Sequence, residues 1–201
     1  MKMSQTGHFA RFRREALRTG TVTVARAAEI GVSRKLLSNW AKTGKVVRAA
    51  CGLYQLPSAV PDEMELLVRR ARKIAFSHES ALFLNGLSER CPADYSVTVP
   101  SSASLPRFRG TALKAYYVKD ALFGVGLERR PTPTGGVVPC YNAERTVCDV
   151  LRSRTRVDEE TLVAALRRFA ASPSKDLNRL AGYARLFRIE KLVHERLEVL
   201  L

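Results

Sequence analysis

The first sixty residues contain three stretches in which apolar side chains recur at the spacing of one helix face. The first runs from His8 to Thr19, and the second begins after Thr23, whose hydroxyl can cap a helix. The third follows Ser33, another good capping residue, and ends before Gly44. The apolar members of the three stripes are, in chain order, Phe9, Phe12, Ala16, Leu17, Val24, Ala27, Ala28, Ile30, Leu37, Trp40 and Ala41.

The second and third stretches have the spacing of a helix-turn-helix. Ala27 is a small residue where two helices would cross, and Gly31 follows where the turn needs a positive φ. Residues 46–49 and 53–56 then predict two short strands joined by a tip at 50–52. The pattern as a whole predicts a winged helix-turn-helix domain over residues 1–57.

The outer face of the predicted third helix is basic and amide-bearing, and it contains no acid. Arginine can bind guanine through two hydrogen bonds and asparagine can bind adenine, whereas lysine and serine suit phosphates. An ordinary helical pair with a solvated basic face is the alternative, but the following hairpin and the absence of acids favour DNA. The candidate DNA-binding residues are Ser33, Arg34, Lys35, Ser38, Asn39, Lys42, Lys45 and Arg48, the last of them in the wing.

The distribution of charge points the same way. Residues 1–60 contain eleven lysines and arginines against two glutamates, a net charge of +9, so the remaining 141 residues carry +6 of the total of +15. A positive field concentrated over one third of the chain favours a polyanionic partner. The arginines of the first predicted helix either add phosphate contacts or form a solvated face, and the sequence leaves both interpretations open.

The rest of the chain mixes helical and strand-like periods. Two prolines, Pro57 and Pro61, bracket a short break and predict a hinge at 58–61 before a second domain at 62–201. Helical spacing predicts helices at 62–74, 77–86, 143–152, 158–171, 176–187 and 190–201, and alternation predicts strands at 95–99, 113–118, 126–131 and 137–140. We therefore expect an α+β chain whose second domain is a small mixed sheet of three or four strands with a C-terminal helical bundle.

Motifs of known enzymes are absent from the sequence. His78, Glu79 and Ser80 are consecutive, so on a helix they point in different directions and cannot form a catalytic triad by themselves. The chain has neither the acid-x-Lys spacing of metal-dependent nucleases nor a Gly-rich nucleotide loop, and its cysteines and histidines lack metal-ligand spacing. We expect no enzyme activity, metal or cofactor. No apolar stretch has membrane-spanning length and no signal core begins the chain, so a cytoplasmic location is expected.

Five segments together resemble the AbiEi-type antitoxins of type IV abortive-infection toxin–antitoxin systems. They are the N-terminal unit ending in TGKVVRAACGLYQLP, the predicted helix SHESALFLNGL, the predicted strand YSVTVP, the segment VPCYNAERTVCDVLR and the C-terminal stretch LAGYARLFRIEKLVHERLEVLL. The resemblance implies an N-terminal winged domain that binds inverted repeats in its own promoter and represses it. It also implies that the C-terminal domain opposes a nucleotidyltransferase-like toxin encoded next to it, without a stable complex between the two.

Carried over by position, the resemblance places the recognition helix at residues 34–42. Glu144, Arg145 and Thr146 match a family motif, which we expect to be architectural rather than catalytic. The expected partners are double-stranded DNA and the cognate toxin, with a protein that is monomeric in solution and paired on DNA. Two alternatives stay open: an orphan winged-helix transcription factor whose C-terminal domain dimerises or senses a ligand, and a DNA-processing enzyme.

Overall fold

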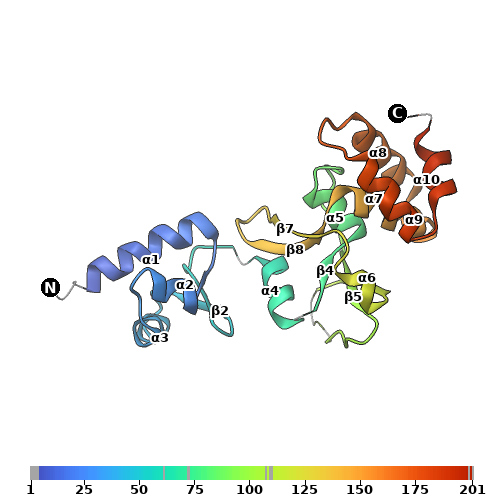
Figure 1. Cartoon of the computed structure of the whole chain (residues 1–201). Coiled ribbons are helices and arrows are strands. Elements are labelled where there is room, and N and C mark those ends of the chain that lie inside the picture. Colours follow the sequence, from blue (N-terminus) through green and yellow to red (C-terminus); the bar gives the residue numbers. More distant parts are fainter. Residues whose placement is uncertain are drawn as a thin grey trace. The chain divides into compact units, whose positions relative to one another are not determined.

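A computed structural model describes residues 5–60, 62–71, 73–106, 108, 111–198 and 200, and they form an α+β protein, as expected (Figure 1). The chain divides into two compact units. Unit 1 is Met1–Arg70 together with Pro131–Val137, and unit 2 is Ala71–Arg130 with Val138–Leu201. The predicted hinge at 58–61, of which Pro61 lies outside the described residues, stays a prediction.

Unit 1 combines helices with a small antiparallel sheet in which β3 lies between β1 and β2. Strand β1 was not expected from the sequence, because two residues are too few to show an alternating pattern. The elements are α1 (Gln5–Thr19), β1 (Val22–Thr23), α2 (Val24–Glu29), α3 (Arg34–Lys42), β2 (Val47–Ala50), β3 (Leu53–Gln55) and α4 (Glu63–Arg70).

The core of unit 1 is built around the single tryptophan of the chain, Trp40. The ring centroids of Phe9 and Phe12 lie 5.2 and 5.8 Å from that of Trp40, both in edge-to-face geometry, so α1 packs on α3 through aromatic contacts. Two predicted core positions are wrong. Leu17 is 70% exposed and Ala28 is exposed, because each lies at the edge of a stripe whose neighbours already fill the contact.

Unit 2 contains a five-stranded mixed sheet with the strand order β6-β5-β4-β8-β7. The pairs β5·β6 and β4·β8 are parallel, and the pair β4·β5 is antiparallel. The strands are β4 (Ala75–Phe76), β5 (Tyr95–Pro100), β6 (Leu113–Val118), β7 (Leu127–Pro131) and β8 (Val137–Tyr141).

The predicted helix through Ile74 is too long, and the central strand β4 that follows it was not predicted. Helix α4 ends at Arg70, and Ala75 and Phe76 have no exposed surface in the middle of the sheet. A strand that is buried on both faces shows no alternation, and Ala71 and Ile74 continue the helical spacing by coincidence. The sheet of unit 2 therefore has five strands among the described residues, where the sequence predicted three or four.

The helices of unit 2 enclose a second apolar core between α5, α7, α8, α9 and α10. Asn142, Asp158 and Asp176 cap their helices by accepting hydrogen bonds from backbone N–H groups, whereas the side chain of Ser77 does not cap α5. No described helix combines the length and the apolar character that crossing a membrane requires. The helices are α5 (His78–Leu84), α6 (Asp120–Phe123), α7 (Ala143–Arg152), α8 (Glu159–Ala171), α9 (Leu177–Leu186) and α10 (Glu190–Leu197), with a 3₁₀ turn, η1 (Arg154–Arg156).

Arg145 is a buried cation at the centre of unit 2. Its side chain is 1% exposed, and its Nε donates to Asp149 Oδ2 at 3.0 Å. Nη1 donates to the carbonyl groups of Leu122 and Val125, and the guanidinium lies 4.2 Å from the ring centroids of both Tyr141 and Phe187. These contacts connect α7 to α6 and to Phe187, which follows the C-terminal end of α9. The side chain of Arg145 therefore stabilises the packing of unit 2.

Candidate nucleic-acid interface

The turn between α2 and α3 is fixed by caps on both sides. Thr23 Oγ1 accepts the N–H of Arg26 at 2.9 Å, and Ser33 Oγ accepts the N–H of Leu36 at 3.3 Å. Gly31 has a φ of 79°, and the Val32 N–H donates to the Ala27 carbonyl at 2.7 Å, which closes the turn. The positive φ at Gly31 and the complete burial of Ala27 agree with the sequence prediction for these two positions.

Arg11 supports this turn from α1, which the sequence analysis did not find. A Cβ on Gly31 would lie 3.0 Å from Arg11 Nη2, so the guanidinium covers the turn closely. Arg11 Nη2 is also 2.8 Å from His8 Nδ1. A glycine with positive φ signals a turn, but no pattern in the sequence shows which distant side chain will cover it.

All the predicted interface residues are exposed. The outward side of α3 presents a guanidinium, ammonium groups, a hydroxyl and an amide, while Leu37 and Trp40 fill the core on the opposite side. The exposed set contains Ser33, Arg34, Lys35, Ser38, Asn39, Lys42, Lys45 and Arg48.

The cations of this surface have no acidic partners. Within the described part of the chain, no ion pair involves any of the five basic side chains of the set. The sequence explains why, because no acid occurs between Glu29 and Asp62. Uncompensated charges of this kind are available to an external anion.

The two acids of the first sixty residues are occupied elsewhere. Glu15 Oε1 accepts from Arg18 Nη2 at 2.7 Å and from Arg26 Nε at 2.8 Å, and Glu29 pairs with Arg26 Nη1 at 2.7 Å. The hydrogen bonds from Arg26 and Arg18 lower the pKa of Glu15 from 4.5 to about 2. The acidic charge is thus neutralised at the contact of α1 with α2, and the outer face of α3 keeps its full positive charge.

A hollow of about 340 Å³ lies at the C-terminal end of α3. Asn39, Lys42 and Lys45 line it together with Thr43 and the edge of Trp40. The adjacent β2–β3 hairpin presents exposed Arg48, whose Nη2 donates to Cys51 Sγ at 3.6 Å. This arrangement offers several donors to a phosphate backbone over a short distance.

The side chains of His78, Glu79 and Ser80 contact different partners, as the geometry of a helix predicts for consecutive residues. His78 is buried between two hydroxyl groups, with Nδ1 2.9 Å from Ser77 Oγ and Nε2 3.1 Å from Ser153 Oγ. Burial, reinforced by nearby arginines and Lys114, lowers the pKa of His78 well below its ordinary value. Glu79 pairs with Lys114 instead, and Ser80 Oγ accepts the N–H of Ser96.

Comparison with known proteins shows that the fold is similar to that of a solved structure. No protein-family model matches the chain, and no curated protein matches it. The crystal structure of the Rv2827c protein from Mycobacterium tuberculosis is similar with a TM-score of 0.53 and 15% sequence identity. The match covers 95% of this chain and 80% of that one, so the likeness concerns the fold of nearly the whole chain.

Proposed function

We propose that this chain is a sequence-specific DNA-binding autorepressor and the antitoxin of a type IV toxin–antitoxin system. In this proposal α2 and α3 form a helix-turn-helix, the β2–β3 hairpin is its wing, and α3 is the recognition helix. The observation that carries the DNA-binding half is the exposed outer face of α3, whose cations lack acidic partners among the described residues. Nine helical residues extend over about 13 Å, a length that suits the major groove.

Roles within the proposed interface follow from side-chain chemistry. Arg34 and Asn39 have the fork and amide geometries that discriminate base edges, so they are assigned to sequence readout. Lys42, Lys45 and Arg48 are assigned to phosphates, which fix the position of the protein but carry no sequence information. Two protomers on an inverted repeat would place two copies of α3 in successive major grooves.

The antitoxin half rests on the resemblance of segments in unit 2 to the AbiEi type. In this proposal unit 2 opposes a nucleotidyltransferase-like toxin encoded beside the gene, without a stable complex. The alternative is an orphan winged-helix transcription factor whose C-terminal part dimerises or senses a ligand. The observation that favours a dimerising role is the exposure of two leucines of α9, Leu177 and Leu186.

A two-part cellular assay tests the proposal. The upstream DNA of the gene drives a reporter, and the chain is supplied from a second plasmid, with Arg34→Ala as the test variant and the exposed Arg167→Gln as the matched control. Repression by wild type and control but not by Arg34→Ala is the expected result. Rescue of growth from the neighbouring toxin by both variants would support the antitoxin role. Rescue by neither variant nor wild type would leave the orphan regulator as the better account.

A further inference from the structure

The helical hairpin formed by α9 and α10 in unit 2 has a groove along its surface. The space between the two helices has a volume of about 310 Å³. Residues three or four positions apart line it from each side, so each helix contributes one face. The lining includes Leu177, Ala181 and Arg185 from α9, and Glu190, His194 and Glu198 from α10 and its C-terminal end.

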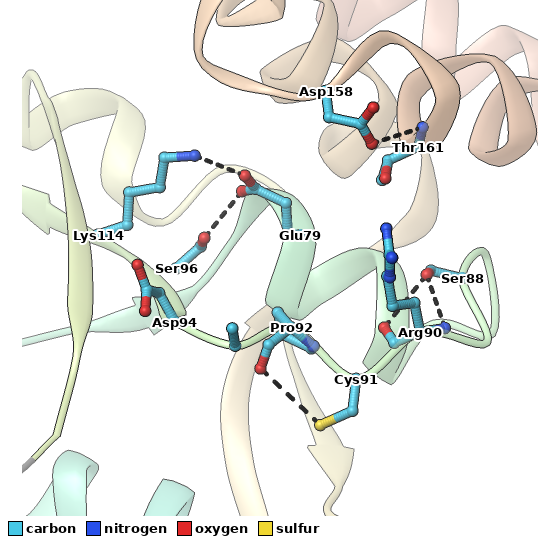
Figure 2. Close-up of a pocket in the computed structure, with 11 residues that line it drawn as sticks. Glu79, Ser88, Arg90, Cys91, Pro92, Asp94, Ser96, Lys114, Asp158 and Thr161 are labelled. Atoms are coloured by element: carbon cyan, nitrogen blue, oxygen red, sulfur yellow. Dashed lines mark hydrogen bonds and ion pairs between the residues drawn. The ribbon is translucent and has the colours of Figure 1, made fainter.

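The larger hollow of unit 2, of about 400 Å³, has a different chemistry (Figure 2). Charged side chains line it, and they compensate one another. Lys114 Nζ donates to Glu79 Oε1 at 2.7 Å on one side. On another side, hydrogen bonding by Thr161 and the nearby guanidinium of Arg90 lower the pKa of Asp158. The α9–α10 groove is instead lined mainly by apolar side chains, whose burial drives most protein association.

The groove has a buried floor and an exposed rim. Leu180 and Val193 are buried in the floor, whereas Leu177 is 44% exposed and Ala181 is also exposed. Ala181 and Ala184 are small, so a helix from a partner can approach α9 closely at these positions. Covering this groove with apolar side chains would remove the rim from water and stabilise the complex by the hydrophobic effect.

The rim carries charges of both signs. Arg185 Nε lies 3.4 Å from Glu190 Oε1, and His194 Nε2 lies 3.4 Å from Glu198 Oε2. With a neutral His194, one arginine against two glutamates gives the lining a net charge of −1, in a chain whose net charge is +15. Two copies of so basic a chain repel each other overall. The groove is a surface at which two copies can meet without that repulsion.

The order of charges along the groove is self-complementary. Because residues 187–189 alone connect α9 to α10, Arg185 and Glu190 lie at the connected end, and Leu177 and Glu198 lie at the opposite end. A twofold axis along the groove sets α9 of one protomer against α10 of its partner, so Arg185 faces the partner's Glu190 at two equivalent places. The four apolar faces then form a core of the kind found in four-helix bundles.

We propose that the α9–α10 groove binds a second copy of this chain, through packing of two α9–α10 hairpins around a twofold axis. The dimer is weak in free solution and forms when two protomers are held close together, as on one inverted repeat, where their effective concentration is high. The proposal rests on the proposed DNA binding only for this cellular role. Self-association itself is measured without DNA, so the two proposals can fail separately.

Sedimentation equilibrium of the full chain, from about 10 μM to about 1 mM protein, tests the proposal over the range of weak dissociation constants. Wild type is expected to show a monomer–dimer equilibrium. Arg185→Glu alone and Glu190→Arg alone each place like charges opposite each other twice, and each should raise the dissociation constant about tenfold. An equimolar mixture of the two variants should associate nearly as well as wild type, because each variant then meets the opposite charge in the other.

Two further variants locate the interface. Ala181→Glu sets a charge in the groove at an exposed helical position, where the fold tolerates it, and should weaken association about tenfold or more. Arg167→Glu, an exposed charge reversal on α8, is the matched control and should leave association unchanged. A wild-type chain that stays monomeric to about 1 mM overturns the proposal, and a basic amphipathic helix of another protein then becomes the better occupant. A mixture of Arg185→Glu and Glu190→Arg that associates no better than either variant alone also overturns it.

Discussion

Glu15 and Arg26, which lie on different helices of unit 1, are joined by a hydrogen bond of 2.8 Å between Oε1 and Nε. Arg18 donates to the same carboxylate oxygen at 2.7 Å, and Glu15 is only 8% exposed. This carboxylate therefore connects α1 to α2, and its charge is compensated by two arginines.

The first prediction concerns Glu15 and acid. Because the pKa of Glu15 is lowered from 4.5 to about 2, the unfolded chain takes up this proton first as the pH falls. The stabilisation is complete above pH 4.5 and is lost progressively toward pH 2. Glu15→Gln should lower the free energy of unfolding at pH 7 by about 1 kcal/mol, since both arginines are partly exposed.

Urea titrations followed by Trp40 fluorescence at pH 7, 4 and 3 measure this effect, because Trp40 is the only tryptophan and lies in unit 1. Glu29→Gln is the matched control, since Glu29 forms an exposed pair with the same Arg26. A difference between wild type and Glu15→Gln that stays constant from pH 7 to 3 would show that the carboxylate is not held as described.

The second prediction concerns Gly20, which lies against the 131–137 segment of unit 1. Gly20 has a φ of 72°, and a Cβ there would lie 2.6 Å from the carbonyl oxygen of Thr134. Gly44 has a nearly equal φ of 71° with no atom within 4 Å of a Cβ, so it is the matched control. Each substitution by alanine should cost about 1 kcal/mol from the left-handed backbone.

Gly20→Ala should cost a further 1–3 kcal/mol or so from overlap with the Thr134 carbonyl, about the usual effect of overpacking. The midpoint of the Trp40 fluorescence transition in urea gives both values. Equal destabilisation by Gly20→Ala and Gly44→Ala would mean that residues 131–137 do not pack on unit 1 in solution.

The third prediction concerns the buried Arg145. Arg145→Met leaves the carboxylate of Asp149, which is 4% exposed, without its hydrogen-bonded partner, so unit 2 should lose about 3–5 kcal/mol. Arg152→Met is the control, because Arg152 lies 3.8 Å from the same carboxylate at 39% exposure and should cost about 1 kcal/mol or less. Circular dichroism should show an early unfolding transition in Arg145→Met while the Trp40 signal stays near that of wild type. If the unfolding transition of Arg145→Met measured by circular dichroism were the same as that of the wild type, Arg145 would not stabilise unit 2.

The fourth prediction separates readout from phosphate binding in the proposed interface. Arg34→Ala and Asn39→Ala should each cost about 1–3 kcal/mol on the correct operator and relax its specificity. Arg48→Ala should weaken binding to all sequences by a similar factor, because a phosphate contact does not depend on the base. Fluorescence anisotropy on the operator and on a scrambled duplex measures both effects. Normal binding by both α3 variants would show that α3 is not the recognition helix.

The N-terminal elements were predictable because local signals agreed with the tertiary structure. The caps Thr23 and Ser33, the positive φ of Gly31 and the buried stripe of α3 all act within a few residues. The exposure of the α3 basic face follows directly from that stripe. The lack of acidic partners for this face could be inferred only in part. The sequence shows that no acid occurs between Glu29 and Asp62, but it does not show that Glu15 pairs with Arg26.

Unit 2 was predicted less well where structure depends on distant contacts. Strand β4 is two residues long and is defined only by its neighbours β5 and β8, which lie far along the chain. Ser77 directly precedes α5 but does not cap it: its hydroxyl lies 2.9 Å from His78 Nδ1, and the backbone at His78 adopts a φ of 47°. A hollow of unit 2 is lined by residues from separate stretches of the chain, among them Glu79, Arg90, Lys114 and Asp158, so no local pattern in the sequence predicts it.

The measurement that tests the central claim most directly is anisotropy titration of the protein on its own upstream DNA at two salt concentrations, with a scrambled duplex of equal length as the control. The account predicts tighter binding to the upstream DNA, with affinity falling steeply as salt rises because phosphate contacts release counterions. Arg34→Ala should remove most of the preference for the upstream sequence. Equal affinity of the wild-type chain for both duplexes at each salt concentration would contradict the claim that α3 reads a specific operator.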